Sequence, residues 1–258
     1  MLIDSHAHLE MKEFEHDREQ VMERAKLAGI DFIVTVGTNL SLSRKAVSLA
    51  DQYDHIYATV GIHPHDVGKI GNKTYDDLRE LARHKKVVAY GEIGLDFFRN
   101  IAPQAQQREK FSEQLLLAQE LNLPVIIHDR DAHEQSLRMV RASGIRRGVF
   151  HCFSGDYEMA KQCLDLGFYL SVPGVVTFDK AKTLQNVVKH VPLSSLLLET
   201  DCPYLAPNPY RGKRNEPAYI VQTAKKVAEI KGLLWEDVAA VTAQNTLSLF
   251  HIEASLNK

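Results

Sequence analysis

Cysteine is scarce in this chain of 258 residues, which contains only Cys152, Cys163 and Cys202. Their number is odd and no two form a CxxC pair, so a disulfide framework is excluded and reduced thiols are expected. The sequence also lacks long hydrophobic runs, and its first residues show no basic segment followed by an apolar one. These absences exclude a membrane-spanning helix and a secretory signal, and they predict a cytoplasmic protein with no membrane partner.

A large charge of either sign is missing as well. The 31 lysines and arginines nearly balance the 33 aspartates and glutamates, which leaves a formal net charge of −2. A general attraction to polyanions is therefore excluded, and contact with nucleic acid would need a local basic patch. Linkers, low-complexity segments and internal repeats are also lacking, and nothing indicates an obligate protein partner. We expect one domain over residues 1–258, because α/β barrels commonly reach this length.

Short apolar runs typical of buried strands recur along the chain and alternate with segments of helical periodicity. The runs are Met1–Asp4, Phe32–Val36, Ile56–Val60, Val87–Glu92, Val125–His128, Gly148–Phe153, Phe168–Val172 and Leu196–Asp201. The last two helices are expected at about 217–231 and 235–249. Eight strand–helix units with right-handed crossovers close naturally into a (β/α)8 TIM barrel. An open doubly wound sheet is the alternative architecture.

Several of these strands end in residues that can bind a metal ion. The six candidate ligands are His6, His8, Glu92, His128, His151 and Asp201. His6 and His8 are two residues apart, so a strand directs both imidazoles to one side. In a barrel the carboxyl ends of all strands meet at one face, where active sites of this architecture lie. The pattern therefore predicts a metal site at the C-terminal ends of the strands.

The number of donors indicates how many ions the site holds. A single catalytic zinc usually takes three protein ligands and a water, whereas six nitrogen and oxygen donors suit two divalent ions joined by a carboxylate. Glu92 lies on a central strand and is the expected bridge. We predict one ion at His6, His8 and Asp201 and a second at His128 and His151. Zn2+, Mn2+ and Mg2+ are all compatible with such ligands.

The motifs around these residues resemble, in the same order, those of the TatD family of metal-dependent deoxyribonucleases, within the amidohydrolase-like superfamily. They are His6-Ala7-His8, Gly91-Glu92-Ile93-Gly94-Leu95-Asp96, His128-Asp129-Arg130, His151-Cys152-Phe153-Ser154-Gly155 and Glu199-Thr200-Asp201-Cys202-Pro203-Tyr204-Leu205. The resemblance implies a (β/α)8 barrel, a divalent-metal site and phosphodiester hydrolysis. It assigns the metal role to the same six residues, and no lysine occupies the bridging place used in other branches of the superfamily.

Two further residues are expected beside the ions. His63, in the segment Gly61-Ile62-His63-Pro64-His65, resembles a family histidine near the active site. It is a candidate catalytic and substrate-binding donor to a substrate oxygen, and a packed loop histidine is the alternative. Glu199 shares a strand face with Asp201, so it is expected one layer deeper, where it would support a histidine ligand.

A basic loop follows the eighth expected strand and contains Arg211, Lys213 and Arg214 around a glycine. Barrels often bind phosphate after strands seven and eight, so these cations are candidate substrate-binding residues. A solvated charged loop is the other interpretation, and the family resemblance favours phosphate binding. Phe97 and Phe98 are candidates either for stacking on a base or for packing in the core.

The predicted reaction is metal-assisted hydrolysis of phosphodiester bonds in DNA. The ions would lower the pKa of a bound water and polarise the phosphoryl oxygen, while Asp201 accepts or relays the proton and Glu92 positions the ions. The resemblance suggests 3′→5′ exonuclease action on strand ends of DNA, with RNA as a second substrate. Two alternatives stay open: hydrolysis of a C–N or ester bond, such as that of aminoacyl-tRNA, and a non-catalytic, metal-stabilised nucleic-acid-binding protein.

Overall fold

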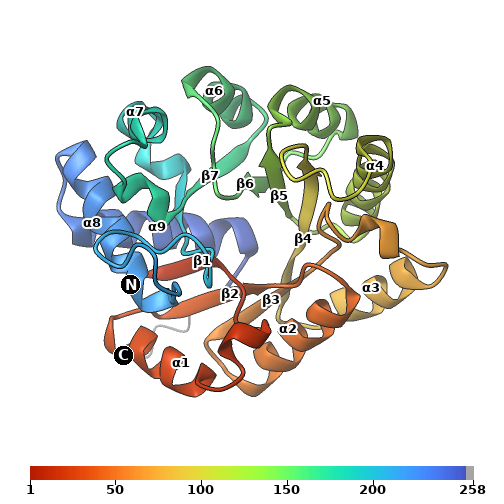
Figure 1. Ribbon diagram of the computed structural model, residues 1–258, viewed down its shortest axis with the longest axis horizontal. Coiled ribbons are helices and arrows are strands. Elements are labelled where there is room, and N and C mark those ends of the chain that lie inside the picture. Colours follow the sequence, from red (N-terminus) through yellow and green to blue (C-terminus); the bar gives the residue numbers. More distant parts are fainter. Residues whose placement is uncertain (254–258) are drawn as a thin grey trace.

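The computed structural model describes residues 1–253, and its centre is a barrel-shaped sheet of eight parallel strands (Figure 1). Each strand pairs with the next one in chain order; Ile33 of β2, for example, lies opposite Ile56 of β3. The strands are β1 Ile3–Ala7, β2 Phe32–Val36, β3 Ile56–Val60, β4 Val87–Asp96, β5 Val125–Arg130, β6 Gly148–Phe150, β7 Phe168–Val172 and β8 Leu196–Leu198. The predicted (β/α)8 TIM barrel is confirmed, and the open doubly wound alternative is wrong.

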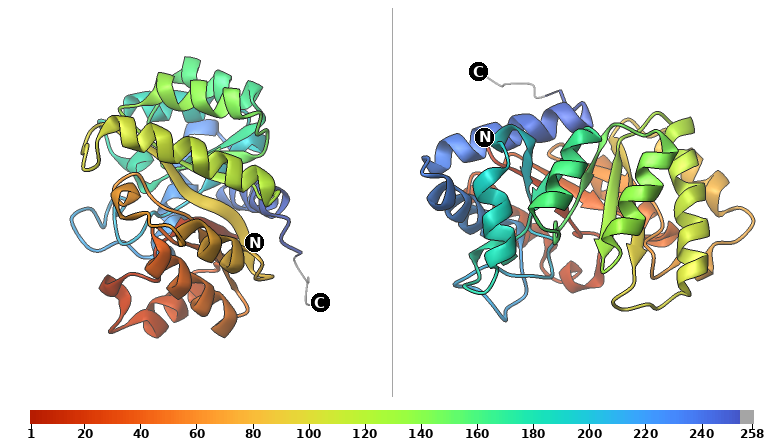
Figure 2. Two further views of the ribbon diagram at one scale, coloured as in Figure 1. Left: turned by 90° about the vertical axis from the view of Figure 1, so that its right-hand side faces the viewer. Right: turned by 90° about the horizontal axis from the view of Figure 1, so that it is seen from above.

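Helices lie around the outer side of the sheet and across one end of it (Figure 2). They are α1 Arg18–Leu27, α2 Leu40–Gln52, α3 Thr74–Ala82, α4 Gln104–Glu120, α5 His133–Ser143, α6 Tyr157–Asp165, α7 Lys182–His190, α8 Ile220–Lys231 and α9 Trp235–Phe250. Local sequence explains several ends. The side chains of Asn39 and Asp156 accept hydrogen bonds from the first-turn amides of α2 and α6. Gly144 ends α5 at a φ of 77°, a conformation that glycine adopts without strain.

The strand ends differ from the predicted ones in an informative way. Strands β2, β3 and β7 have the predicted bounds. Strand β1 starts two residues later than predicted, and β4 and β5 extend beyond their predicted ends. β6 and β8 stop early, at Phe150 and Leu198. Cys152 and Asp201 adopt φ angles of 45° and 55° just beyond those two ends. This left-handed conformation turns the chain out of the strand direction, so the residues that follow belong to the mouth of the barrel.

The inside of the barrel is closed at one end by α9. Side chains on the inner face of the strands form one apolar cluster with Leu247 and Phe250 of α9. Most of the strand residues in it occupy the first or second position of their strand: Ile3, Phe32, Tyr57, Val88, Ile126, Val149, Tyr169 and Leu197. The helix therefore covers the N-terminal end of the barrel and leaves the C-terminal end accessible.

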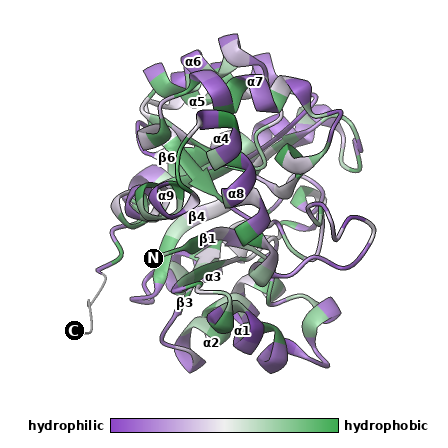
Figure 3. Ribbon diagram, turned by 90° about the vertical axis from the view of Figure 1, so that its left-hand side faces the viewer, coloured by the Kyte–Doolittle hydropathy of each residue, from purple (hydrophilic) through white to green (hydrophobic). Residues whose placement is uncertain are grey.

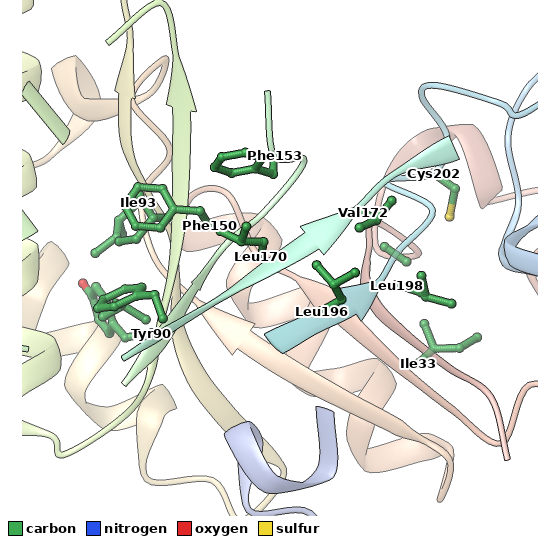
Figure 4. Close-up of a cluster of buried hydrophobic side chains, with 14 of the residues drawn as sticks. Ile33, Tyr90, Ile93, Phe150, Phe153, Leu170, Val172, Leu196, Leu198 and Cys202 are labelled. Carbon is green, nitrogen blue, oxygen red and sulfur yellow. The ribbon is translucent and has the colours of Figure 1, made fainter. Parts of the chain in front are cut away.

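A second, larger core fills the space between the sheet and the outer helices. Ile33, Tyr90 and Phe150 are buried there, on the opposite face of the strands from the inner cluster (Figure 4). Hydrophobic residues are concentrated on the strands, and the outward parts of the helices are hydrophilic (Figure 3). This two-layer packing holds the strand ends in fixed positions.

Strands β1 and β8 meet through backbone and side-chain hydrogen bonds that complete the barrel. The Asp201 amide donates to the His6 carbonyl at 2.9 Å, just beyond β8. The fully buried Asp4 carboxylate accepts from the backbone amide of Thr200 at 2.9 Å and from its hydroxyl at 2.5 Å. Burial raises the pKa of Asp4 to about 7. The two strands that carry His6 and Asp201 are thereby held side by side.

Asn245→Ala is expected to lower the free energy of unfolding by about 2 kcal/mol. The Asn245 amide of α9 donates to the Leu193 and Leu196 carbonyls at 2.9 and 2.8 Å, at the start of β8. Alanine would leave a buried and a partly buried carbonyl without these donors. Urea unfolding measures the change, and Gln244→Ala, at an exposed neighbouring position, is the matched control. Equal stability of the two variants would contradict the role of this contact.

Three other predictions concern the chain as a whole. Among residues 1–253, no helix has the length and apolar character that crossing a membrane requires. All three cysteines carry free thiols, as expected. The single domain of residues 1–258 stays a prediction, and its last five residues lie outside the described part of the chain.

Candidate metal centre

The six predicted ligands lie together at the C-terminal end of the barrel. His6, Glu92 and His128 belong to strands β1, β4 and β5. His8 and His151 follow directly after β1 and β6, and Asp201 comes three residues after the end of β8. All of these side chains are buried except that of His128, which is half-buried. The barrel thus brings together residues that are up to 195 positions apart in the sequence.

Donor atoms on the β1 side gather around one oxygen of Glu92. His6 Nε2 lies 3.3 Å from His8 Nε2 and 3.4 Å from Glu92 Oε2. Asp201 Oδ1 lies 3.4 Å from His8 Nε2 and 3.7 Å from His6 Nε2. Four donors from three strands therefore face a common point, in the grouping predicted for the first ion.

The other oxygen of Glu92 faces a second group of donors. Glu92 Oε1 lies 2.7 Å from both His128 Nδ1 and His151 Nε2. His63 Nε2 is 3.4 Å from the same oxygen, so the structure adds His63 to this group. Each oxygen of one carboxylate therefore has its own set of imidazoles, which is the arrangement that a bridging ligand requires.

Burial and neighbouring charges shift the pKa values of the groups in this centre in different directions. Burial alone would raise the pKa of Glu92, but the nearby His151, His63 and His128 bring it well below its usual range. Burial lowers the pKa of His6, and burial together with the neighbouring His128 lowers that of His63 further. The carboxylate is therefore ionised and the His6 imidazole is neutral, which are the forms that bind a cation. Burial would lower the pKa of His8, His128 and His151, but neighbouring carboxylates raise it, so a bound cation would displace protons from these three rings.

A hydrogen bond behind His8 and a buried carboxylate behind His151 lie on the far side of these two ligands. His8 Nδ1 lies 2.9 Å from the Val36 carbonyl, which can only accept, so Nδ1 carries a proton and Nε2 is the nitrogen that faces the centre. Behind His151, Glu199 is fully buried, with Oε1 3.7 Å from His151 Nδ1. Glu199 also accepts the backbone amide of Cys152 at 2.7 Å. It lies behind His151, as predicted, and supports the turn that presents this ligand.

Sequence reasoning missed Asp96 and His65. β4 extends four residues past its predicted end, and Asp96, at its last position, lies with Oδ2 3.3 Å from His128 Nε2. His65 Nε2 is 2.8 Å from the same oxygen. Burial would raise the pKa of Asp96, but hydrogen bonds from His128 and His65 keep it well below its usual range. The signal in the sequence was the carboxylate at even spacing from Glu92, which places both on one strand face.

Asp96→Asn is expected to weaken binding of the second metal ion about 10- to 100-fold, because the carboxylate orients His128 and increases its basicity. Calorimetry of Mn2+ or Zn2+ binding to the metal-stripped protein measures the change in affinity. Asp131→Asn makes the same charge change at an exposed position just past β5 and serves as the control. Unchanged affinity in Asp96→Asn would show that Asp96 only packs against the loop.

The basic loop after β8 divides into two parts. Arg214 makes two contacts to Asp17, at 2.6 and 2.8 Å, and its guanidinium lies over the Phe14 ring at 4.8 Å. Arg211 lies over the Phe178 ring at 4.6 Å and lines a cavity of about 450 Å3. Lys213 is exposed and forms no ion pair within residues 1–253. Arg214 therefore anchors the loop, and Arg211 and Lys213 are better placed to meet a ligand.

A TIM barrel with two imidazole groups around one buried carboxylate at its C-terminal end defines a metal-dependent hydrolase. The chain belongs to the TatD-related DNase family, whose model matches residues 3–251. The predicted family is confirmed.

Relatives match along almost the whole chain. This chain is 43% identical to an uncharacterized metal-dependent hydrolase, YabD, of Bacillus subtilis, over 98% of this chain and 100% of the relative. It is 36% identical to the 3′-5′ ssDNA/RNA exonuclease TatD of Pectobacterium atrosepticum, over 97% and 100% of the two chains. The crystal structure of YjjV, a TatD homologue of Escherichia coli, superposes with a TM-score of 0.93 at 32% identity and covers 98% of each chain.

Proposed function

We propose that this protein is a two-metal phosphodiesterase that removes nucleotides from the 3′ ends of single-stranded DNA, with RNA as a second substrate. The observation that carries the proposal is the position of Glu92, whose two oxygens face separate donor groups. The similarity to exonucleases named TatD supports the choice of phosphodiester over other bonds. The proposal includes the cytoplasmic location that the cysteine content predicts, and no obligate protein partner.

Two divalent ions, when bound, would supply positive charge for the phosphoryl oxygen and for the attacking water. His6, His8 and Asp201 would hold one ion, His128 and His151 the other, and Glu92 both. Asp201 is the least enclosed carboxylate of the centre, with 13% of its side chain exposed, and it is ionised because His8 outweighs the effect of burial on its pKa. It therefore accepts or relays the proton of the attacking water.

His63 is suited to donate a hydrogen bond to a substrate oxygen. Its Nδ1 accepts the His65 amide at 3.1 Å, so in the neutral ring the proton lies on Nε2. That N–H points to Glu92 Oε1 in the absence of substrate. A phosphoryl oxygen placed beside Glu92 would take over this donor.

A panel of substrates tests the proposed function. The protein is stripped of metal, reloaded with Mg2+, Mn2+ or Zn2+, and offered 5′-labelled single- and double-stranded DNA, an RNA strand, an ester and an amide. We expect a ladder of single-nucleotide steps on single strands and little turnover of the ester and amide. Preferential ester or amide cleavage would support a C–N or ester hydrolase, and no turnover with any metal would support a non-catalytic protein.

Replacing Arg211 and Lys213 together by serine is expected to raise KM for single-stranded DNA about tenfold. The slope of log KM against log salt should fall by the amount that corresponds to roughly one or two lost phosphate contacts. The matched control is Arg83→Ser with Lys85→Ser, because these exposed cations lie just before β4, at the opposite end of the barrel. The slope of log KM against log salt measures the effect. An equal slope in the two double variants would contradict phosphate binding by this loop.

A further inference from the structure

Exposed apolar side chains gather in two loops at the mouth of the barrel. Phe98 and Ile101, in the loop after β4, are 59% and 62% exposed, and Tyr204 and Leu205, in the loop after β8, are 49% and 37% exposed. Phe98 and Tyr204 are the aromatic members of the exposed large hydrophobic residues in residues 1–253. The metal centre uses neither of them, so these two exposed aromatic rings at the mouth have no role in the site described above.

The two aromatic rings lie on opposite sides of the mouth. Strands β4 and β8 are four positions apart in an eight-stranded barrel, so their ends face each other across its axis. Figure 1 shows the loop after β8, in light blue, across the barrel from the yellow connection between β4 and α4. The ligands Glu92 and Asp201 come from these same two strand ends. A chain that crosses the mouth from one ring to the other therefore passes over the metal centre.

Each ring is attached directly to a ligand-bearing segment. The Tyr204 ring centroid lies 6.3 Å from that of His8, and the Tyr204 amide donates to the Asp201 carbonyl at 2.9 Å. On the other side, the Arg130 guanidinium lies 4.0 Å from the centre of the Phe98 ring. Arg130 comes two residues after His128, and its carbonyl accepts the Phe97 amide at 2.9 Å. Both rings are thus attached to segments that carry metal-ligand candidates.

We propose that Phe98, backed by Arg130, and Tyr204 are stacking platforms for the two nucleobases that flank the scissile phosphate. This inference rests on the proposed nuclease function and deepens it. Aromatic rings bind any base through its face, and the guanidinium of Arg130 adds positive charge for the phosphate backbone. In a duplex the faces of the bases are covered by their neighbours, so two platforms across the centre select unpaired strands independently of sequence.

The test compares oligonucleotides that carry or lack one base. Three 5′-labelled single strands are used: one complete, one with an abasic 3′-terminal nucleotide and one with an abasic penultimate nucleotide. For the native protein, kcat/KM for each abasic strand is expected to be about tenfold lower than for the complete strand. Phe98→Leu and Tyr204→Leu should each abolish this discrimination at one position, and the two variants should act at different positions. Because each ratio compares two rates of one preparation, it does not depend on the folded fraction.

Conservative variants and a control complete the test. Phe98→Trp and Tyr204→Phe keep an aromatic face and should keep tenfold discrimination, and Leu27→Ala, at an 81% exposed position on α1, is the control. The stacking proposal would be wrong if both leucine variants still discriminated against the abasic strands, or if the native protein cleaved all three strands equally. Neither result would contradict the proposed nuclease function. A native protein that cleaves no strand, with any metal, would overturn both.

Discussion

Asp201→Asn is expected to reduce kcat on single-stranded DNA by about a thousandfold at saturating metal, in the range typical for loss of a general base. Asparagine keeps the size of the side chain and one acceptor oxygen, so His6 and His8 keep a polar neighbour at the Oδ1 position. It cannot accept the proton of the attacking water. Single-turnover cleavage of a 5′-labelled strand over a range of metal concentrations separates this loss from weaker metal binding.

The matched control for this variant is Asp165→Asn, which makes the same change at an exposed position at the end of α6. Its kcat should equal that of the native protein. Near-native kcat in Asp201→Asn with metal bound would rule out the proton-transfer role, and Asp201 would then be a ligand only.

Glu92→Gln is expected to abolish measurable activity and to weaken both metal sites, because each of its oxygens faces a separate group of imidazoles. The amide offers one oxygen and no charge, so one group loses its shared ligand and both lose the negative charge that offsets the ions. Calorimetry with Mn2+ or Zn2+ should show lower affinity at both sites, with a reduction of more than a hundredfold at one of them. Loss of only one ion, with the other bound at native affinity, would contradict the bridging role.

The control for Glu92→Gln is Glu80→Gln on α3, where the glutamate is 73% exposed and pairs only with Arg83 among the described residues. It should bind metal as the native protein does. Circular dichroism of both variants without metal shows whether the barrel has formed.

The grouping of the six candidate ligands could be predicted from sequence because its signals are local. Each ligand follows a short apolar run, and the closure of eight such runs into a barrel brings their ends to one face. Asp96 was missed because β4 continues past Glu92, and only the pairing of Leu95 and Asp96 with Asp129 and Arg130 of β5 extends it. The end of a strand depends on its partner strand, and sequence periodicity alone does not show the partner.

The basic loop shows the complementary limit. The sequence does not distinguish Arg211, Lys213 and Arg214. In the structure Arg214 pairs with Asp17, which is 197 residues away in the chain, and this contact distinguishes it from the other two. Phe97 and Phe98 were equally ambiguous. In the structure Phe97 packs against the core, and Phe98 stays exposed under Arg130. Charge and aromaticity can be read from sequence, whereas the partner of each side chain depends on the tertiary fold.

The most direct test of a two-ion nuclease is a titration of the stripped protein with metal while cleavage of a 5′-labelled single strand is followed. Two ions bridged by Glu92 predict that the rate stays low at one equivalent, rises steeply towards the second and reaches its plateau at two per chain. A plateau at one equivalent would contradict the two-ion centre, and the absence of cleavage at any equivalent of Mg2+, Mn2+ or Zn2+ would contradict the nuclease function itself.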